Sequence, residues 1–440
     1  MIHDRDSLAT TPAHDLALSC LEAGIRAAQP DRIVAEQISV DEGVLHVADG
    51  RYDLAEYDEI VLLGGGKAAD VVARALEDVL DDRIDRGLVV TSDPVETETV
   101  EVVEGDHPVP DEQAREGARQ IIDRAREQDE RVLLLVPITG GGSALLPLPA
   151  GDLRLADLQS ITEALVESGA AIEEINAVRK HLSAIKGGGL ARAAAPATVV
   201  GLVFSDVVGD DPGVVASGPT ASDETTYEDA LAVLDHYDVD APGTVIGHLE
   251  AGVAGEHDET PEAELDHVDN YVLANAWTAL SAARDVVAVS EYDPLVLSSR
   301  IRGESTEAAL SQVAIAEECR DTGNPIEPPA VLLSGGETTV TVLGNGDGGP
   351  NLEFALRAGI EGVENVVCAS VDTDGADGGT NAAGALVDGQ TVSNPMAARV
   401  ALVENDAQPF LDKRDALIET GPTGTNVNDL RVFVIDEPES

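Results

Sequence analysis

Two of the four lysines in this 440-residue chain lie six residues apart in the segment INAVRKHLSAIKGGG (175–189). They are Lys180 and Lys186, and the first has Arg179 and His181 as its immediate neighbours. A compact ammonium group and a planar, bidentate guanidinium can together hold a small dianion. The cluster therefore indicates a site for a substrate that carries carboxylate and phosphate oxygens.

One helix is expected to position these cations. Arg179 and Lys186 are seven residues apart, so a helix through both would place them nearly on one face, with the other basic side chains to either side. The alternative interpretation is ion pairing with nearby acids such as Glu173 and Glu174. Three of the four lysines lie in this cluster or beside a glycine loop, and this concentration favours a binding function.

A third lysine, Lys67, follows the glycines of GGGKAAD (64–70), between an expected strand and an expected helix. Glycines at such a turn let backbone N–H groups face an anion, and the N-terminus of the helix adds positive potential. Ala68 stands where a Walker A loop has the Ser or Thr that binds magnesium, so the turn is not of that type. We predict that Lys67 binds an anion; a tight turn with Lys67 in solvent is the alternative.

The same turn also matches a loose dinucleotide-binding pattern, Gly64-x-Gly66-x-x-Ala69. Asp93, after the next expected strand, is a candidate ligand for the ribose of a dinucleotide. A match of this kind is weak evidence when it stands alone, and it leaves a nicotinamide-dependent enzyme open as an alternative.

A serine occupies a second glycine loop, TGGGSALL (139–146). The loop is not a G-x-S-x-G nucleophile elbow, because Ala144 and Leu145 follow Ser143. We therefore predict that Ser143 hydrogen-bonds to a substrate carboxylate or phosphate rather than acting as a nucleophile. A helix-capping serine is the structural alternative.

Acids gather among glycines at the expected ends of strands in SDVVGDDPG (205–213), GGET (335–338) and VDTDGADGG (371–379). With 83 acids in the chain, most are expected at the surface, but strand-terminal loops are where α/β proteins bind ligands. Asp206, Asp372 and Asp374 could hold Mg²⁺, which takes one or two carboxylates plus phosphate oxygens. A calcium loop is the alternative for the last segment, although the EF-hand spacing is absent.

The net charge of −56 and the pI near 4.1 lie far outside ordinary globular composition. Because 43 % of the residues are hydrophobic and form runs such as 132–136 and 199–204, we expect a folded protein with an acidic surface rather than a disordered chain. Such a surface is typical of proteins in concentrated salt, where the screening length falls to roughly 3 Å at 1 M. Without a basic footprint, nucleic acid and anionic membranes are excluded as partners.

Cysteine usage and the N-terminus indicate the cellular compartment. Cys20, Cys319 and Cys368 are odd in number and lack metal-ligand spacing, so reduced, half-buried thiols are expected. No apolar stretch approaches a membrane span, and the N-terminus has no signal-peptide character. We predict a halophilic cytoplasmic enzyme that acts on small molecules as a monomer or homodimer.

Strand and helix patterns are expected to alternate along the chain, which is the signature of an α/β fold. The periodic stretches are 13–28, 59–80, 86–92, 131–146, 155–170, 197–211, 270–287, 304–319 and 330–346. Between them, 241–267 mixes glycine, proline and acids with weak periodicity. We predict two domains, 1–245 and 246–440, each with a mainly parallel or mixed sheet flanked by helices. The C-terminal tail is expected to be able to pack back on the first domain.

Taken in order, these motifs resemble the class II glycerate kinases (glycerate 2-kinases), in which an N-terminal α/β domain is joined to a C-terminal domain named MOFRL. The resemblance spans residues 13–430 and rests on GGGKAA, DHPVPD, TGGGSALL, INAVRKHLSAIKGGGLA, SDVVGDDPGVVASGPT, LSGGETTV, DTDGADGGTNAAGAL and TGPTGTNVNDL. It implies ATP-dependent phosphorylation of D-glycerate to 2-phosphoglycerate with Mg²⁺, by direct in-line transfer, in a cleft between the domains.

Carried over by position, the resemblance assigns roles to individual residues. The catalytic candidates are Lys67 and Arg179, which would stabilise the phosphoryl group or anchor the carboxylate, and Asp206, which would orient or deprotonate the attacking hydroxyl. The substrate-binding candidates are Gly65, Gly66, Ser143, Lys180, His181 and Lys186. The nucleotide-binding candidates are Ser334, Gly335, Gly336, Glu337, Asn351, Thr423 and Asn426. The metal candidates are Asp372 and Asp374.

One loop, GNGDGGPNLE (344–353), departs from the family pattern G-x-G-R-G-G-R-N-Q-E. Two arginines and a glutamine are replaced by Asp347, Pro350 and Leu352. The missing positive charge is expected from Arg302 or Arg357; otherwise the loop acts through its backbone and Asn351.

Two other functions remain open. Members of the family have often been named hydroxypyruvate reductases, and an NAD(P)H-dependent reductase would use Gly64–Ala69 for the pyrophosphate and His107 or His181 as its acid. A non-catalytic binding module is the third possibility, but it does not explain why lysines are kept beside glycine turns. The fourth lysine, Lys413, fits no motif.

Overall fold

The computed structural model of the chain describes residues 1–263 and 265–437, and their contacts form two compact units. Unit 1 comprises 1–32, 206–209 and the described residues from 274 onward, and unit 2 comprises 33–205 and 210–273. The predicted division at 245/246 therefore differs from this one. The first 32 residues group with the C-terminal part of the chain, and the main boundary lies at 273/274.

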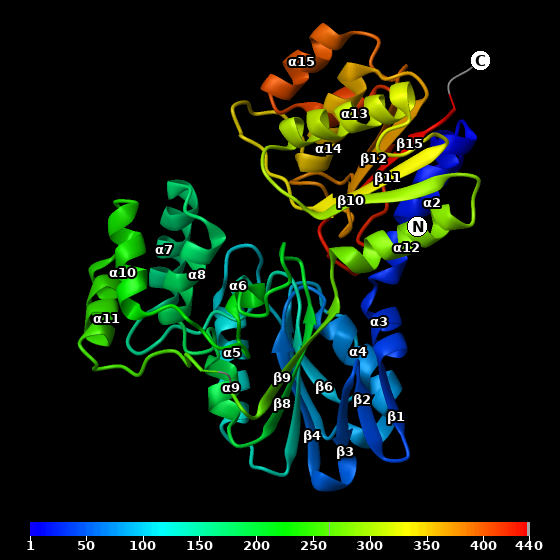
Figure 1. Cartoon of the computed structure of the whole chain (residues 1–440). Helices are drawn as coiled ribbons and strands as arrows, with labels where there is room; N and C mark the ends of the chain where they lie inside the picture. The colour runs from blue at the N-terminus through cyan, green and yellow to red at the C-terminus, as the bar shows by residue number, and fades with distance from the viewer. Residues whose placement is uncertain (264, 438–440) are drawn as a thin grey trace. The chain divides into compact units, whose positions relative to one another are not determined.

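Unit 2 is built on a six-stranded sheet of order β6-β5-β4-β7-β8-β9, in which the neighbours from β6 to β8 run parallel (Figure 1). Its strands are β4 (Glu59–Gly65), β5 (Arg86–Thr91), β6 (Val100–Glu104), β7 (Val132–Ile138), β8 (Thr198–Phe204) and β9 (Val268–Ala274). Every residue of β7 is buried, as expected for a parallel strand whose two faces are both covered. The apolar runs seen in the sequence thus form the middle of this sheet.

The strand order reverses between β4 and β7. From β4 the chain passes through α4 (Ala69–Leu80) to β5 on one side, and it later returns through α5 (Glu112–Ala125) to β7 on the other side. In open α/β sheets, ligands bind in the crevice outside the carboxyl ends of the strands at such a point. The segments that follow β4 and β7 therefore define the first candidate site.

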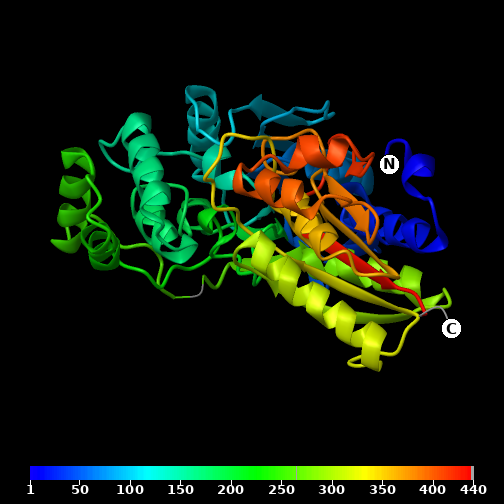
Figure 2. The ribbon, with the colours of Figure 1, turned by 90° about the horizontal axis from the view of Figure 1, so that it is seen from above.

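Four helices of unit 2 pack on one another and share a small core (Figure 1 and Figure 2). They are α7 (Leu155–Ser168), α8 (Ile172–His181), α10 (Tyr227–His236) and α11 (Gly243–Val253). The weakly periodic stretch 241–267, in or near which the domain boundary is predicted, forms helix α11 in its first part. Val245 and Leu249 are four residues apart, so α11 presents one apolar face to this core. Glu264, in the same stretch, lies outside the described residues.

Shorter elements complete unit 2. Three strands form a small antiparallel sheet of order β1-β2-β3. These and the remaining helices are β1 (Ile38–Asp41), β2 (Val44–Val47), β3 (Gly50–Asp53), α3 (Pro30–Gln37), α6 (Gly142–Leu145), α9 (Gly189–Ala194), η1 (Leu54–Glu56), η2 (Asp81–Arg83) and η3 (Val215–Ser217).

Unit 1 contains a mixed six-stranded sheet of order β10-β11-β15-β12-β13-β14. Only β10 and β11 pair in parallel among these described strands, and the other pairs are antiparallel. The strands are β10 (Asp293–Ile301), β11 (Ala330–Gly336), β12 (Val366–Asp372), β13 (Gly384–Asp388), β14 (Leu417–Ile418) and β15 (Asp429–Ile435). Because β15 lies between β11 and β12, the C-terminal segment belongs to the sheet of unit 1 and not to the predicted first domain.

Helices cover the sheet of unit 1 on both faces (Figure 1). The N-terminal helix α2 (Pro12–Ala27) packs against α12 (Ala276–Ala288) and β15, whereas α13 (Ser305–Thr322) and α14 (Pro350–Glu361) pack together. At Gly24 a Cβ would lie 2.5 Å from the side chain of Leu430 and 3.0 Å from Ala279 O. The glycine therefore lets α2 approach β15 and α12 closely, which accounts for its place in unit 1. The remaining helices are α1 (Arg5–Leu8), α15 (Pro395–Val403) and α16 (Ala407–Asp412).

The α/β class predicted from the sequence is confirmed, with one parallel and one mixed sheet. Among the described residues, no helix is long and apolar enough to cross a membrane. Cys20, Cys319 and Cys368 are free thiols, as predicted, but all three are buried rather than half-buried.

Candidate active site

The loops that follow β4 and β7 are bonded directly to each other at the point where the strand order reverses. The backbone N–H of Lys67 donates to Gly140 O at 2.8 Å, and the N–H of Ala68 donates to the hydroxyl of Thr139 at 3.1 Å. Both bonds join a loop after one strand to a loop after its neighbour. The two glycine motifs found in the sequence therefore form one site.

Glycine is required where these loops touch. Gly66 has φ +138°, and a Cβ there would lie 2.2 Å from the Thr139 hydroxyl. Gly141 has φ +77°, and a Cβ there would lie 2.9 Å from Lys67 Cγ and 3.0 Å from His107 Cδ2. The bare backbone of Gly141 thus fits between these two side chains.

His107 is brought into the site by the structure. Burial, and then the charge of Lys67, lowers the pKa of His107 to about 4. The imidazole is therefore neutral at neutral pH, and the positive charge on this side of the site comes from Lys67.

The helix expected to present Arg179 and Lys186 together ends too early to do so. Helix α8 stops at His181, so Lys186 lies in the following turn, and the face-sharing prediction is wrong. The two charges are nevertheless close enough to interact. Burial, together with the charge of Arg179, lowers the pKa of Lys186 to about 7.

Lys186 is held by the serine loop rather than by acids. Its Nζ donates to Ser143 O at 2.8 Å and to Leu146 O at 3.1 Å. Arg179 is half-buried, burial lowers its pKa, and its buried Nε has no hydrogen-bond partner within the described residues. An unfilled buried donor costs roughly 1–3 kcal/mol, so this nitrogen suits a ligand oxygen.

The other two members of the cluster, Lys180 and His181, have protein partners. Lys180 Nζ donates to Asp223 at 3.0 Å, and His181 Nε2 lies 2.8 Å from Glu259 Oε1. The ion-pairing alternative thus holds for this pair, but with acids from later in the chain. A substrate role for either residue remains a prediction.

A chain of hydroxyl and amide groups that the sequence analysis did not find supports Ser143. The Ser143 Oγ lies 2.8 Å from the Ser217 Oγ, which donates to Asn176 Oδ1 at 2.9 Å. Asn176 and Arg179 are three residues apart on α8 and therefore share a face. The segment SGPT (217–220), already visible as a glycine turn, was the available signal for Ser217.

Ser217 lies in a strained turn that is pressed against the serine loop. Ala216 and Ser217 have φ of +52° and +60°, which costs each non-glycine residue of order 1–3 kcal/mol. A Cβ on Gly142 would lie 2.6 Å from Ala216 Cβ. Surrounding packing therefore fixes Ser217 in an unfavourable conformation next to Ser143.

In unit 1, Glu337 follows β11 at the predicted nucleotide loop. Burial raises its pKa to about 7, and the charges of Asp206 and Asp429 contribute in the same direction. Asp206 belongs to the segment 206–209 that groups with unit 1. The structure thus brings the predicted residues Asp206 and Glu337 close enough to interact electrostatically.

Asn351 is fully buried and joins two acids that the sequence analysis missed. Its Nδ2 donates to Asp429 at 2.7 Å and to Asp377 at 3.2 Å, and its Oδ1 accepts from Ser370 at 2.6 Å. Asp377 also accepts the N–H of Asn351 and of Leu352 at the start of α14. The departing loop is therefore anchored through Asn351 and its backbone, and a role of these groups in binding the nucleotide stays a prediction.

The buried arginine of this unit is Arg431, which was not predicted. Its guanidinium bonds Asp429 and donates to the Thr338 hydroxyl at 2.7 Å, and it lies 4.6 Å from the ring centre of Phe354. Of the two arginines proposed to replace the missing charge, Arg302 is exposed and Arg357 pairs with Glu361 at 2.9 Å.

Several predicted nucleotide ligands have structural partners. The Ser334 hydroxyl donates to Gln312 at 2.7 Å, the Thr423 hydroxyl donates to Thr373 O at 2.6 Å, and Asn426 Oδ1 accepts the N–H of Asn428 at 2.9 Å. Gly335 and Gly336 end the buried strand β11. A Cβ on Gly336, which has φ +134°, would lie 2.1 Å from Ile301 O, so close strand packing alone explains that glycine.

The two metal candidates lie at the end of β12. Burial raises the pKa of Asp372 well above its usual range, and the charges of Asp374 and Asp429 raise it further. Within the described residues, no three Asp, Glu, His or Cys side chains form a metal-binding group. Mg²⁺ needs one or two carboxylates and takes its other ligands from phosphate and water. Two mutually repelling carboxylates fit such an ion.

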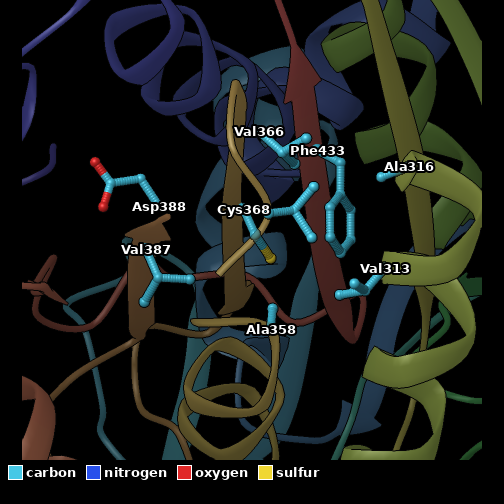
Figure 3. Close-up of a pocket in the computed structure, with 9 residues that line it drawn as sticks. Val313, Ala316, Ala358, Val366, Cys368, Val387, Asp388 and Phe433 are labelled. Atoms are coloured by element: carbon cyan, nitrogen blue, oxygen red, sulfur yellow. The ribbon is translucent and has the colours of Figure 1, made fainter. Parts of the chain in front are cut away.

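A small apolar cavity in unit 1 lies apart from these loops. It has a volume of about 10 Å³ and is lined mainly by aliphatic side chains, Phe433 and Cys368 (Figure 3). Burial raises the pKa of the Cys368 thiol, and the Asp388 carboxylate points away from it (Figure 3). A space of this size holds at most about one water molecule, so it is a packing void.

Comparison with known proteins places the whole chain in one family. Residues 16–250 match a family described as a domain of unknown function, DUF4147, and residues 330–429 match the MOFRL family. The chain is 39 % identical over 436 residues to the glycerate 2-kinase of Pyrococcus horikoshii, which covers 96 % of this chain and 97 % of that protein. It is 38 % identical over 431 residues to the D-glycerate 2-kinase of Thermotoga maritima, with 96 % and 98 % covered.

A solved structure supports the same assignment. The crystal structure of glycerate kinase from Thermotoga maritima matches with a TM-score of 0.83 and 37 % identity, over 96 % of this chain and 98 % of that chain. The chain belongs to the glycerate 2-kinase family, with its DUF4147 and MOFRL domains. The resemblance seen in the sequence motifs is confirmed at the level of the family.

Proposed function

We propose that this protein is a glycerate 2-kinase, which transfers a phosphoryl group from ATP to D-glycerate and forms 2-phosphoglycerate. The observation that carries the proposal is the site at the point of strand reversal, where Lys67 lies against Gly141, Lys186 donates to Ser143 O, and the charge of Arg179 on α8 acts on Lys186. In a chain of net charge −56, such a gathering of cations suits a small anionic substrate. Full-length relatives named for this activity support it.

In the substrate half of the reaction, unit 2 binds and orients D-glycerate. Arg179, with its unfilled Nε, holds the carboxylate. Lys67 stabilises the charge that develops on the transferring phosphoryl group. Phosphoryl transfer depends on positioning and electrostatic stabilisation more than on covalent chemistry, so fixed cations at the end of a rigid sheet are what the step requires.

In the nucleotide half, the loops of unit 1 hold ATP. Glu337 and Asn351 lie at the glycine loops that follow β11 and begin α14. Asp372 and Asp374 would hold Mg²⁺, which supplies charge neutralisation at the phosphates when bound. Asp206, whose charge reaches Glu337, orients the attacking hydroxyl and accepts its proton.

The reductase alternative has less support from the geometry. Gly64 and Gly65 lie inside β4, and their lack of side chains is accounted for by packing. A Cβ on Gly64 would lie 2.1 Å from Pro137 O, and one on Gly65 would lie 2.8 Å from the Leu146 side chain. The pattern Gly64-x-Gly66-x-x-Ala69 therefore has a structural explanation that needs no pyrophosphate.

We also propose that the acidic surface adapts the enzyme to a cytoplasm rich in salt. The 83 acids against 27 basic residues repel one another at low ionic strength, and screening at high salt weakens this repulsion.

A coupled assay tests the proposed activity. The protein is supplied with ATP, Mg²⁺ and D-glycerate in about 2 M KCl, where surface repulsion is screened, and the release of ADP and the position of the new phosphate are measured. A parallel reaction contains hydroxypyruvate and NAD(P)H. We expect ADP together with 2-phosphoglycerate. Oxidation of NAD(P)H without ADP release would replace the kinase with the reductase.

A further inference from the structure

The search for a further function leads to the hydroxyl of Ser143, because the direction of its hydrogen bond is fixed by its neighbours. The Ser217 hydroxyl has one proton, and it is donated to Asn176 Oδ1 at 2.9 Å, an oxygen that can only accept. In its contact with Ser143 at 2.8 Å, Ser217 must therefore be the acceptor. The proton of Ser143 is thus directed toward Ser217.

This direction leaves Ser143 with lone pairs, and no proton, for a ligand. Ser143 is half-buried. Carboxylate and phosphate oxygens are acceptors too, so neither can bond to it while its proton is donated to Ser217. The predicted contact between Ser143 and a substrate carboxylate or phosphate is therefore disfavoured by the structure, whereas a contact that accepts a substrate O–H is allowed.

The position of Ser143 is held from both sides. Lys186 donates to its backbone carbonyl at 2.8 Å, while Ser217, in its strained left-handed turn, holds its hydroxyl. Asn176 is 3 % exposed; its Oδ1 accepts from Ser217, and its buried Nδ2 has no hydrogen-bond partner within the described residues. Ser217 and Asn176 act on the substrate through Ser143 and are positioning residues.

The surrounding site is made of donors. Lys67 and Arg179 present N–H groups and, as cations, lack acceptors, while Lys186 donates to two backbone carbonyls. A hydroxy acid offers the matching pattern, a carboxylate that accepts and a hydroxyl that donates. One fixed acceptor among cations therefore distinguishes an acid with a free hydroxyl from an acid without one.

We propose that Ser143 is a specificity-determining residue that accepts a hydrogen bond from the hydroxyl of the substrate that is not phosphorylated. This inference rests on the proposed glycerate 2-kinase activity and deepens it. A neutral serine whose proton is engaged elsewhere is a poor base, so the contact serves recognition and leaves proton removal to another group. For D-glycerate the recognised group is the hydroxyl on C3.

The test compares D-glycerate with D-lactate, which has the same C2 hydroxyl and configuration but lacks the C3 hydroxyl. The measured quantity is the ratio of kcat/KM for the two acids, followed as ADP release. A site built to bond a hydroxyl rejects the analogue that lacks it by large factors, up to about 10⁴-fold. We expect Ser143→Ala to lower kcat/KM for D-glycerate about tenfold or more and to change that for D-lactate less than about twofold.

Two substitutions at Asn176 test the direction of the hydrogen bonds from Ser143 through Ser217 to Asn176. Asn176→Asp keeps an acceptor for the Ser217 hydroxyl, so the selectivity ratio stays high even if the added charge weakens both acids alike. Asn176→Leu removes the acceptor and lowers the ratio. Ser168→Ala is the matched control, because this half-buried serine of α7 donates to Leu165 O away from the site, and it should leave the ratio unchanged.

Three results would overturn the inference: an equal loss for both acids in Ser143→Ala, no loss for either, or a ratio that collapses as fully in Asn176→Asp as in Asn176→Leu. Calorimetric binding of the two acids, measured on the same variants, does not depend on turnover. If the wild type binds D-glycerate selectively but releases no ADP, the kinase assignment fails while the role of Ser143 stands. In that case the role of Ser143 is judged by whether Ser143→Ala loses the preference for binding D-glycerate over D-lactate.

Discussion

Individual cations in unit 2 differ in what neutralises them. Lys180 is paired with Asp223, so its charge is compensated inside the protein. Lys186 donates to two backbone carbonyls, which satisfy hydrogen bonds but carry no net charge. A buried cation without a compensating anion is costly, and its presence beside Arg179 is understandable if an anionic ligand completes the site.

Replacing Lys67 by Met removes the cation between the two glycine loops with little change in volume. We expect kcat to fall by about 10²–10³, the usual effect of losing one group that stabilises transition-state charge, while the melting temperature changes little. The measurement is steady-state ADP release with D-glycerate at saturating ATP. Lys413→Met is the control: Lys413 is exposed at the end of α16, where a cation favours the helix dipole, and its loss should leave turnover intact. Equal effects of the two substitutions would contradict a role for Lys67.

Lys186 links stability to pH. Its pKa is lowered from 10.5 to about 7 in the folded protein, so between these values the unfolded chain binds the extra proton. The stability that this shift contributes is present above pH 10.5 and is lost as the pH falls through about 7. We expect the free energy of unfolding of the wild type, relative to Lys186→Met, to rise as the pH increases across this window. Denaturant titrations at several pH values measure it, and a difference that stays flat would contradict the lowered pKa of Lys186.

Among the elements, α8 separates two groups of side chains. Asn176 and Arg179 lie on the face toward Ser217 and the serine loop, whereas Lys180 and His181 reach acids that follow much later in the chain. The helix ends before Lys186, and the turn after it returns this lysine to the loop. On the other side of the site, the short glycine loops that connect β4 and β7 to the following helices fix the positions of the loop residues.

Gly141 and Gly169 form a matched pair for testing the glycine loop. Both have left-handed backbones, with φ +77° and +76°, but a Cβ on Gly141 meets Lys67 and His107 whereas one on Gly169 meets nothing within 4 Å. Alanine at either position costs about 1–2 kcal/mol of backbone strain. We expect Gly169→Ala to lower the melting temperature without affecting activity, and Gly141→Ala to lower both. Activity retained in Gly141→Ala, at a melting temperature equal to that of Gly169→Ala, would show that the loop contact is dispensable.

The molecule as a whole carries its charge unevenly: acids dominate the composition, and lysine is kept largely to the site loops. This distribution predicts a strong response to salt. Raising KCl from about 0.2 M to about 2 M shortens the screening length from several ångströms to a few, and we expect the melting temperature to rise by roughly 10 °C or more. NaCl at equal ionic strength should act alike. A melting temperature independent of KCl would contradict adaptation to salt.

Much of the fold could be predicted because the signals are local. The runs at 59–65 and 132–138 are mostly apolar; the first ends in glycines, and the second is followed by Thr139 and the glycines 140–142, so strand, loop and helix follow directly. Helix α11 was missed because it is short and rich in glycine. Its apolar face is recognisable only when it packs on α8 and α10. The grouping of residues 1–32 with unit 1 was missed for a similar reason, since contact between α2 and β15 leaves no local trace in the sequence.

For the site, residue types and spacing were enough to identify the glycine loops, Lys67, Ser143, the basic cluster and the acids at strand ends, because each of these carries its chemistry in a short motif. These motifs could not predict which side chains bond to each other. Whether Lys180 faces Asp223 or a ligand, whether Ser143 donates or accepts, and which arginine is buried beside Asn351 depend on residues separated by dozens of positions. Hydrogen-bond direction is a property of the folded network, so Asn176, Ser217, Asp429 and Arg431 acquire their roles when the chain brings their atoms within about 3 Å of one another.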